Sequence, residues 1–352
     1  MLRYRYEFIN FYSSKNDLWR NYEMVSLLKQ DAEIQLQKHE VRVLPFHIGK
    51  TPVIQLSQRF SKTNNIYLKL ESHNPTGSVK DRAVYAMMEP YLKTGKEESL
   101  HFILPSSGNA GISLAYLCSV FQQKCTIFAS PDIAPIKIAL IKHFGGNVIT
   151  CDGNVSTEPG GWVYESNRFH EKTTSSILLN QFNNEQNVCV HEQTTAPELE
   201  NHMIEKEIVL DYLFVGVGSG GTAQGILNFY KKHQKSTRVI GVEPVGGLLH
   251  GYYHEYESVY VDHGVEALSD CFVPENLNST YRFDDVIQYT DQQMRTMQKR
   301  LETEEGVLVG EATGFMTSAI QDYIEKYDLK GKNIALIATD DAFRYIDGVR
   351  HG

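Results

Sequence analysis

The stretch that decides the fold, residues 74–82, reads Asn-Pro-Thr-Gly-Ser-Val-Lys-Asp-Arg and follows a strand-like apolar run. Asn-Pro and Thr-Gly are typical of turns. Ser78 with Asp81 three residues later resembles a capping box, so a helix is predicted to begin at Val79. Lys80 then lies in the first helical turn, where the positive end of the helix dipole disfavours a cation.

This position and burial both lower the pKa of an ammonium group. A lysine that is partly neutral is a nucleophilic amine of the kind that forms a Schiff base. For this stretch alone, the alternative is a solvent-exposed lysine beside a helix cap. The other motifs of the chain favour the nucleophilic amine.

Composition restricts the class of protein. The 352 residues suffice for one large two-lobed domain or two ordinary ones, and 41% hydrophobic with 22% charged residues is typical of a soluble globular chain. A net charge of −9 argues against a broad surface for nucleic acid or for anionic membranes. We find no signal-peptide core and no apolar run long enough to span a bilayer. The five cysteines are scattered without a Cys-x-x-Cys pair, which indicates reduced thiols in the cytoplasm.

Strand-like and helix-like segments alternate along most of the chain, which predicts parallel βαβ units and an α/β fold. Residues 1–47 precede the first unit and form an N-terminal extension with a helix over 18–38. We expect an N-terminal α/β lobe over 48–185 and a C-terminal α/β lobe over 186–352. Within the second lobe, residues 246–283 are expected to form a loop over the site.

A polar loop, residues 105–111, reads Pro-Ser-Ser-Gly-Asn-Ala-Gly between a predicted strand and a predicted helix. A loop at the start of a helix directs backbone N–H groups towards an anion. Ser106, Ser107 and Asn109 add side-chain donors. An ordinary loop of an α/β unit could have the same composition, so this signal is weak alone.

The strongest local signal is the glycine loop, residues 216–222, which reads Gly-Val-Gly-Ser-Gly-Gly-Thr after a buried strand and before a helix from Ala223. Glycines permit close backbone approach and positive φ. Consecutive N–H groups at a helix N-terminus form an anion site, to which Ser219 and Thr222 add hydroxyl donors. We therefore predict a bound phosphate rather than a purely structural turn.

The same loop, as Gly216-x-Gly218-x-x-Gly221, also matches a dinucleotide fingerprint. Glu243 lies 22 residues beyond Gly221, where a ribose-binding acid is expected. The alternative function is therefore an NAD-dependent oxidoreductase. Three observations argue against this alternative. The motif is late in the chain, and Glu243, which Pro244 follows, could simply end a strand. The lysine loop and the polar loop at 105–111 would also be left without a role.

The motifs at 74–82, 106–111, 180–182 and 218–222 together resemble, in order and spacing, the cysteine synthase and cystathionine β-synthase family. These are pyridoxal 5'-phosphate enzymes of fold type II, and the resemblance spans about 48–348. It implies two lobes like those of tryptophan synthase β. Each lobe would be a mainly parallel twisted sheet flanked by helices, with the cofactor between the lobes.

The resemblance also implies roles for the matching residues. Lys80 would form the Schiff base with the cofactor, and Asn109 would contact its phenolic oxygen. The substrate carboxylate would be bound by Ser106, Ser107, Asn109 and Gln181, with Ala110 where relatives usually have a substrate-binding threonine. The cofactor phosphate would be bound by Gly218, Ser219, Gly220, Gly221 and Thr222.

Asp341 falls where many relatives place a serine beside the pyridine nitrogen, with Asp340 as the other candidate. An aspartate there would keep the nitrogen protonated and stabilise a carbanion more strongly than a serine can. This change, together with Ala110 and the run Glu-Ala-Thr-Gly at 311–314, weakens an assignment to plain O-acetylserine sulfhydrylation.

The implied reaction is β-replacement on a serine- or cysteine-type amino acid through an aminoacrylate, with a thiol, sulfide or an amine as nucleophile. The alternative is β-elimination by a lyase or dehydratase. We expect a homodimer with an amino-acid substrate and no nucleic-acid or membrane partner. We also expect no metal, because the spacing of His250, His254 and His263 fits no standard site.

Overall fold

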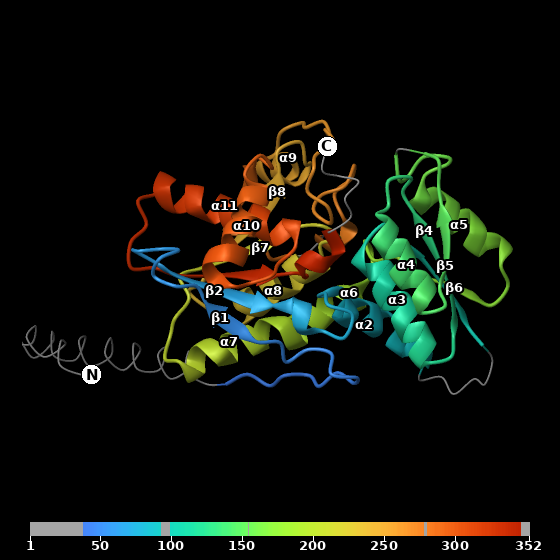
Figure 1. Cartoon of the computed structure of the whole chain (residues 1–352), viewed down its shortest axis with the longest axis horizontal. Coiled ribbons are helices and arrows are strands. Elements are labelled where there is room, and N and C mark those ends of the chain that lie inside the picture. The colour runs from blue at the N-terminus through green and yellow to red at the C-terminus, as the bar shows by residue number, and fades with distance from the viewer. Residues whose placement is uncertain (1–37, 93–98, 154, 278–279, 346–352) are drawn as a thin grey trace, which may run out of the picture.

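The structure is a computed structural model that describes residues 38–92, 99–153, 155–277 and 280–345. Two α/β lobes lie side by side, a small one of green elements and a larger one that contains the rest (Figure 1). The predicted fold class is confirmed. The helix predicted over 18–38 falls outside the described residues except for its last residue.

The small lobe is a four-stranded parallel sheet in the order β5-β4-β3-β6, flanked by helices. Its elements, in chain order, are β3 (His101–Pro105), α3 (Asn109–Val120), β4 (Lys124–Ala129), α4 (Pro135–His143), β5 (Asn147–Thr150), α5 (Trp162–Lys172) and β6 (Ser176–Leu178). Apolar residues on both faces of β3 and β4 are buried, as expected for strands covered by helices on either side.

The larger lobe is a six-stranded sheet in the order β1-β2-β10-β7-β8-β9, parallel except for β1. Its strands are β1 (Val53–Gln55), β2 (Asn65–Leu70), β7 (Tyr212–Gly216), β8 (Arg238–Pro244), β9 (Asp285–Tyr289) and β10 (Asn333–Ala338). The remaining α-helices are α2 (Lys80–Leu92), α6 (Glu185–Val190), α7 (Ala196–Glu205), α8 (Gly221–Lys232), α9 (Leu249–His254), α10 (Met294–Glu305) and α11 (Glu311–Lys326).

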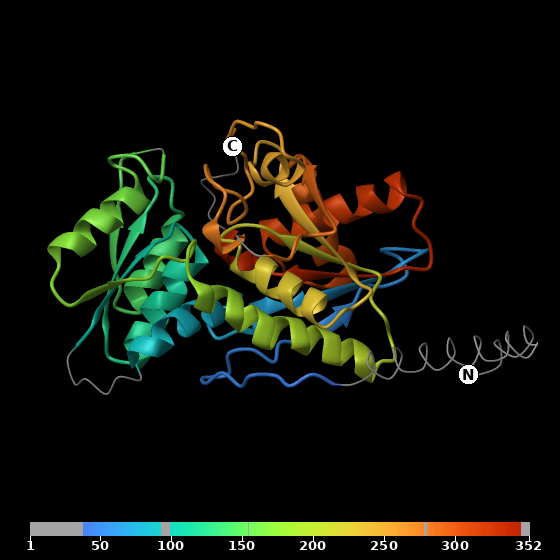
Figure 2. The same cartoon turned by 180° about the vertical axis from the view of Figure 1, so that it is seen from behind.

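The predicted boundary between lobes is wrong for the first two strands. β1 and β2 fall within 48–185 but belong to the larger sheet, where Leu68 of β2 is in register with Leu336 of β10. Figure 2 shows these blue strands beside the red strand from the other end of the chain. The apolar run of β2 is buried on both faces, which fits a central strand of either sheet, so the sequence pattern alone does not select the partner.

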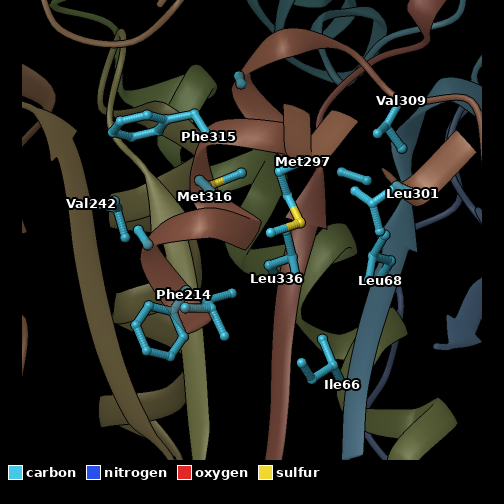
Figure 3. Packing of buried hydrophobic residues seen from close by; sticks show 14 of the residues in the cluster. Ile66, Leu68, Phe214, Val242, Met297, Leu301, Val309, Phe315, Met316 and Leu336 are labelled. Atoms are coloured by element: carbon cyan, nitrogen blue, oxygen red, sulfur yellow. The ribbon is translucent and has the colours of Figure 1, made fainter. Parts of the chain in front are cut away.

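The larger lobe has an apolar core on each face of this sheet, one against α10 and α11 and the other against α7 and α8. Ile66, Leu68, Phe214 and Leu336 project from three adjacent strands towards α10 and α11 (Figure 3). Burying each such side chain contributes about 1.5–3 kcal/mol. Because β2, β7 and β10 are parallel and packed in register, their carboxyl ends lie at one edge of the sheet.

Candidate active site

The loops that follow β2, β7 and β10 meet at this edge. The backbone N–H of Val79 donates to the carbonyl of Thr339 at 2.8 Å, which joins the lysine loop to the end of β10. Lys80 Nζ lies 3.4 Å from Ser219 Oγ in the glycine loop. The structure therefore brings together the lysine loop and the glycine loop, although 139 positions separate Lys80 from Ser219.

The pKa of the Lys80 amine is lowered, so part of this lysine is neutral at physiological pH. Burial lowers its pKa from 10.5 to about 8, and the negative charge of Asp340 opposes part of this shift. About a tenth of the lysine is therefore neutral at pH 7, compared with less than about a thousandth for an ordinary lysine. A neutral amine is the form that attacks an aldehyde.

The lysine loop is held by a different hydrogen-bond pattern from the predicted capping box. Ser78 Oγ accepts from the N–H of Lys80 at 3.3 Å, as a cap does. The Asp81 carboxylate, however, accepts from the N–H and hydroxyl of Thr76 at 2.7 and 2.5 Å and from Ser113 Oγ at 2.6 Å. Asp81 is fully buried, so it fixes the turn before Lys80 rather than the helix end itself.

A buried ionic network lies beneath the loop. Arg82 donates to Glu71 at 2.7 and 3.0 Å and to Glu198 at 2.7 and 2.8 Å, and Lys69 Nζ pairs with Glu198 at 2.8 Å. Burial alone would raise the pKa of Glu71, but Arg82 and Lys69 outweigh it and hold this pKa at about 2. The network joins β2, α2 and α7, and so anchors both ends of the lysine loop.

The glycine loop forms a cradle, Gly218–Thr222, in which neighbouring protein atoms leave no space for a side chain at two of the glycines. A Cβ on Gly218 would lie 2.1 Å from the carbonyl oxygen of Ala267, and one on Gly221 would lie 2.1 Å from Asn187 Oδ1. Gly220 has φ of +80°, a conformation that favours glycine. The loop ends at the N-terminus of α8, whose unpaired N–H groups suit a phosphate.

His191 supports this cradle and was not predicted. It begins a π-helical turn, His191–Thr195, of a kind often found at functional sites. Its Nε2 lies 3.1 Å from Thr222 Oγ1 and its Nδ1 lies 2.8 Å from Thr195 Oγ1. Burial, with a smaller contribution from Arg82, lowers its pKa to about 3, so the ring is neutral at physiological pH.

The predicted substrate loop lines the cavity. Ser106 and Asn109 are buried at its wall, and Ser107 Oγ accepts from the N–H of Ser130 at 2.6 Å, which leaves the hydroxyl proton free to donate elsewhere. Gln181 donates its amide to the carbonyl of Pro105 at 3.2 Å, and so lies against this loop. Ala110 also lines the cavity.

Asn109 is linked to the end of β10. It donates to Asp340 Oδ2 at 2.7 Å and accepts from Arg344 at 3.1 Å, while the hydroxyl of Tyr345 donates to the same Asp340 oxygen at 2.6 Å. Asp341 accepts from the N–H of Phe343 at 2.8 Å, whereas Asp340 is buried and its negative charge acts on the pKa of Lys80. The geometry therefore favours Asp340 over Asp341 as the carboxylate of the site.

Two connected cavities surround the lysine. The inner one, about 40 Å³, is lined by Lys80, the glycine loop and Thr339, and the outer one, about 150 Å³, shares Lys80 and Asn109 with it as wall residues. Sequence reasoning missed several lining residues, which are Thr339 in the inner cavity and Lys137, Trp162, Glu266, Asp270 and Tyr345 in the outer one. One signal was present, because Lys137 lies four residues before the buried Ile141 and therefore on the buried face of its helix.

Glu243 does not take the place of a ribose-binding acid. Its carboxylate accepts from the N–H groups of Leu249 and His250 at 3.0 and 2.6 Å and from Gln288 at 3.1 Å. These bonds occupy the buried carboxylate at the start of α9. The alternative prediction of an NAD-dependent oxidoreductase, which needs Glu243 to bind the ribose of a dinucleotide, is wrong.

The comparison with protein families agrees with this geometry. Residues 44–340 match the family model described as "Pyridoxal-phosphate dependent enzyme". The chain belongs to this family. Pyridoxal 5'-phosphate is therefore the cofactor, and the resemblance noted from the motifs is confirmed.

Relatives of this pyridoxal-phosphate enzyme include a cysteine synthase of Staphylococcus aureus strain Mu50, 31% identical over 304 residues, which cover 85% of the chain and 93% of that protein. Among solved structures, a hydrogen sulfide-producing enzyme from Fusobacterium nucleatum has a TM-score of 0.77 at 27% identity, covering 85% of this chain and 97% of that one. An O-acetylserine-dependent cystathionine β-synthase from Helicobacter pylori has a TM-score of 0.76 at 28% identity, covering 87% and 98%.

The residues present fit the cofactor. Gly218, Ser219, Gly220 and Thr222 line the same cavity as Lys80, at the N-terminus of α8, so a phosphate and an aldehyde could be held at one site. Within the described residues, no group of three or more His, Cys, Asp or Glu is placed to hold a metal, and no helix is long and apolar enough to cross a membrane.

Proposed function

We propose that this enzyme catalyses β-replacement on an amino acid that carries a leaving group on Cβ. The observation that carries the proposal is the position of Lys80. Its amine lies between a phosphate cradle and the Ser106–Asn109 loop, and its pKa is lowered to about 8. The cysteine synthase relatives and the O-acetylserine-dependent neighbour support the same reaction class.

In this proposal the glycine loop, Ser219 and Thr222 hold the phosphate, and Lys80 holds the aldehyde carbon. Bound pyridoxal phosphate supplies a sink for the electron pair left when the Cα–H bond breaks. Ser106, Ser107 and Gln181 bind the substrate carboxylate, which orients the Cα–H bond towards Lys80.

The freed Lys80 amine then removes the α-proton, a general-base step that typically contributes about 10²–10⁴-fold. The leaving group departs from Cβ with its bonding electrons, a nucleophile supplies a new pair to the same carbon, and Lys80 returns the proton to Cα. Thr339 lines the inner cavity and Asp340 accepts from Asn109 in its wall, and a group of this kind would pair with the pyridine nitrogen of the cofactor. We propose one of them for that role in place of Asp341.

β-Elimination is the second candidate function. It differs only in that water, rather than a second substrate, completes the reaction. The hydrogen sulfide-producing neighbour favours it, because release of sulfide from a β-carbon is an elimination or an exchange. The burial of Ser106, Asn109 and Gln181 favours replacement, because a loop that closes on the carboxylate excludes water.

One experiment tests both. The purified protein should have the visible absorption band of lysine-bound pyridoxal phosphate, and Lys80→Ala should lack it. With O-acetyl-L-serine and sulfide, replacement predicts cysteine as the main product, while elimination predicts pyruvate. A wild-type protein with no visible band after incubation with the cofactor would refute the proposal for Lys80.

The expected homodimer and cytoplasmic location remain predictions; we propose the first on the resemblance and the second on the scattered cysteines. Sedimentation equilibrium of the holoenzyme measures the first. A single species at the mass of one 40.0 kDa chain would contradict it. Fractionation of cells that express the full chain measures the second.

A further inference from the structure

A buried arginine near the end of the described chain reaches the site. Arg344 belongs to the short helical turn Ala342–Tyr345, and it is 4% exposed. One of its terminal nitrogens donates to Asn109 Oδ1 at 3.1 Å. Within the described residues its Nε has no hydrogen-bond partner, and Asp341 Oδ2 lies 4.0 Å from this atom. Because a buried charge with incomplete pairing contributes little to stability, these contacts point to a role at the site.

Arg344 also packs against the lysine loop. A Cβ on Gly77 would lie 2.8 Å from a terminal nitrogen of Arg344. Gly77 has φ of +80°, so the turn before Lys80 needs glycine both for its backbone conformation and for this close approach. The guanidinium therefore lies between the turn that positions Lys80 and the side chain of Asn109.

Two groups of opposite charge fix the orientation of the Asn109 amide. A carboxylate only accepts hydrogen bonds, and a guanidinium only donates them. The amide nitrogen of Asn109 must therefore face Asp340, at 2.7 Å, and the amide oxygen must face Arg344. An amide nitrogen carries two hydrogens. One N–H of Asn109 thus remains for a ligand in the two cavities that this residue lines.

The covalent structure of pyridoxal phosphate indicates which of its atoms this N–H meets. On the ring, the carbon that bears the aldehyde is flanked by the carbon with the phosphate arm and by the carbon with the phenolic oxygen. Among the described side chains that line the inner cavity, Asn109 and Thr339 are the neutral donors outside the glycine loop. Thr339 is a candidate for the pyridine nitrogen, so Asn109 is the donor left for the phenolic oxygen.

We propose that Arg344 is a positioning residue for the cofactor and acts through Asn109. The guanidinium holds the amide oxygen, which fixes the free N–H towards the phenolic oxygen. It also polarises the amide, so that this N–H becomes a stronger donor. A stronger donor favours the form of the lysine-bound cofactor in which the phenolic oxygen is negative. This inference rests on the proposed attachment of the cofactor to Lys80, and it is the same for replacement and for elimination.

The test is the absorption spectrum of the holoenzyme without substrate, at equal cofactor content. The form with a negative phenolic oxygen absorbs in the visible, and the form with a protonated oxygen absorbs in the near ultraviolet. Arg344→Met should lower the ratio of visible to near-ultraviolet absorbance at least about fivefold, because a hydrogen bond to a charged group typically changes an equilibrium by about tenfold or more and here one amide transmits the effect. Arg344→Lys, which keeps a charged donor, should restore part of the ratio.

Phe343→Ala is the matched control, because Phe343 lies in the same turn and is 60% exposed. It should leave the ratio unchanged. If Arg344→Met does not fold, the double variant Arg344→Met/Asp341→Asn removes the neighbouring carboxylate charge as well and serves instead.

A double-mutant cycle tests whether Arg344 acts through Asn109. Asn109→Ala alone should lower the ratio at least as much as Arg344→Met does, and adding Arg344→Met to it should change the ratio less than about twofold. Equal spectra for the wild type and Arg344→Met would overturn the inference, as would additive effects of the two substitutions. A wild-type holoenzyme with no visible band would overturn the attachment to Lys80 as well, which distinguishes failure of the proposed function from failure of this inference alone.

Discussion

Replacement of His191 by glutamine tests how the phosphate cradle is held. The imidazole is buried, lies 3.1 Å from Thr222 Oγ1, and has its pKa lowered from 6.5 to about 3. In the unfolded chain this histidine takes up a proton below pH 6.5, whereas in the folded protein it stays neutral to about pH 3. The free energy of unfolding therefore falls as the pH drops through this window, and His191 has no such effect above pH 6.5.

The size of the effect follows from the two pKa values. At pH 5, about 1.5 units below the pKa of His191 in the unfolded chain, this histidine is protonated in the unfolded chain and still neutral in the folded protein. His191 alone should therefore lower the free energy of unfolding by about 2 kcal/mol relative to pH 8. Other groups titrate in both proteins. The quantity to measure is the difference between the wild type and His191→Gln, since glutamine can still donate and accept a hydrogen bond but does not titrate.

The assay is urea unfolding of the apo-protein at pH 8 and pH 5, followed by fluorescence. We expect the wild type to lose about 2 kcal/mol more than His191→Gln between these pH values. His143→Gln, an exposed position on α4, is the control and should follow the wild type. Parallel pH profiles for wild type and His191→Gln would refute the reasoning, because they would mean that the ring is protonated without cost in the folded state.

Three further predictions concern the lysine and its supports. The rate at which the apo-protein captures pyridoxal phosphate should rise about tenfold per pH unit up to about pH 8 and then level, because only the neutral Lys80 amine reacts; a rise that continues unchanged to pH 10 would contradict the lowered pKa. Arg82→Met should lower the free energy of unfolding by about 3–5 kcal/mol, because it leaves buried carboxylates unpaired, and adding Glu71→Gln should restore part of it. Gly221→Ala should displace Asn187 and weaken cofactor binding at least about tenfold by equilibrium dialysis, while an unchanged affinity would show that the cradle has room.

Local sequence patterns predicted much of the site. Each of the motifs at Lys80, Ser106–Asn109 and Gly218–Thr222 combines a strand end, a polar or glycine turn and a helix start within a few residues. Such motifs can be recognised without knowing the tertiary structure. Their convergence was implied by the family resemblance and not by local patterns, because β3 belongs to a different sheet from β2 and β7.

The features that were missed depend on contacts between distant segments. Lys137 and Glu266 come from different lobes, and His191 reaches Thr222 from another helix. The choice between Asp340 and Asp341 depended on which way successive side chains of one segment point, and a shift of one residue reverses that direction. The sequence also placed β2 in the wrong lobe, because its apolar pattern does not indicate which strand pairs with it.

The position of β2 beside β10 has a consequence for synthesis on the ribosome. The strands and helices of the small lobe occupy one continuous segment, 101–178, and can pair as soon as they emerge. The Lys80 loop emerges earlier, yet the strand that must hold it against Thr339 is almost the last part of the described chain to be made. A nascent or prematurely terminated chain without β10 therefore has Lys80 but lacks the strand that helps to bury it and to lower its pKa. We expect only chains that include β10 to bind a vitamin B6 aldehyde.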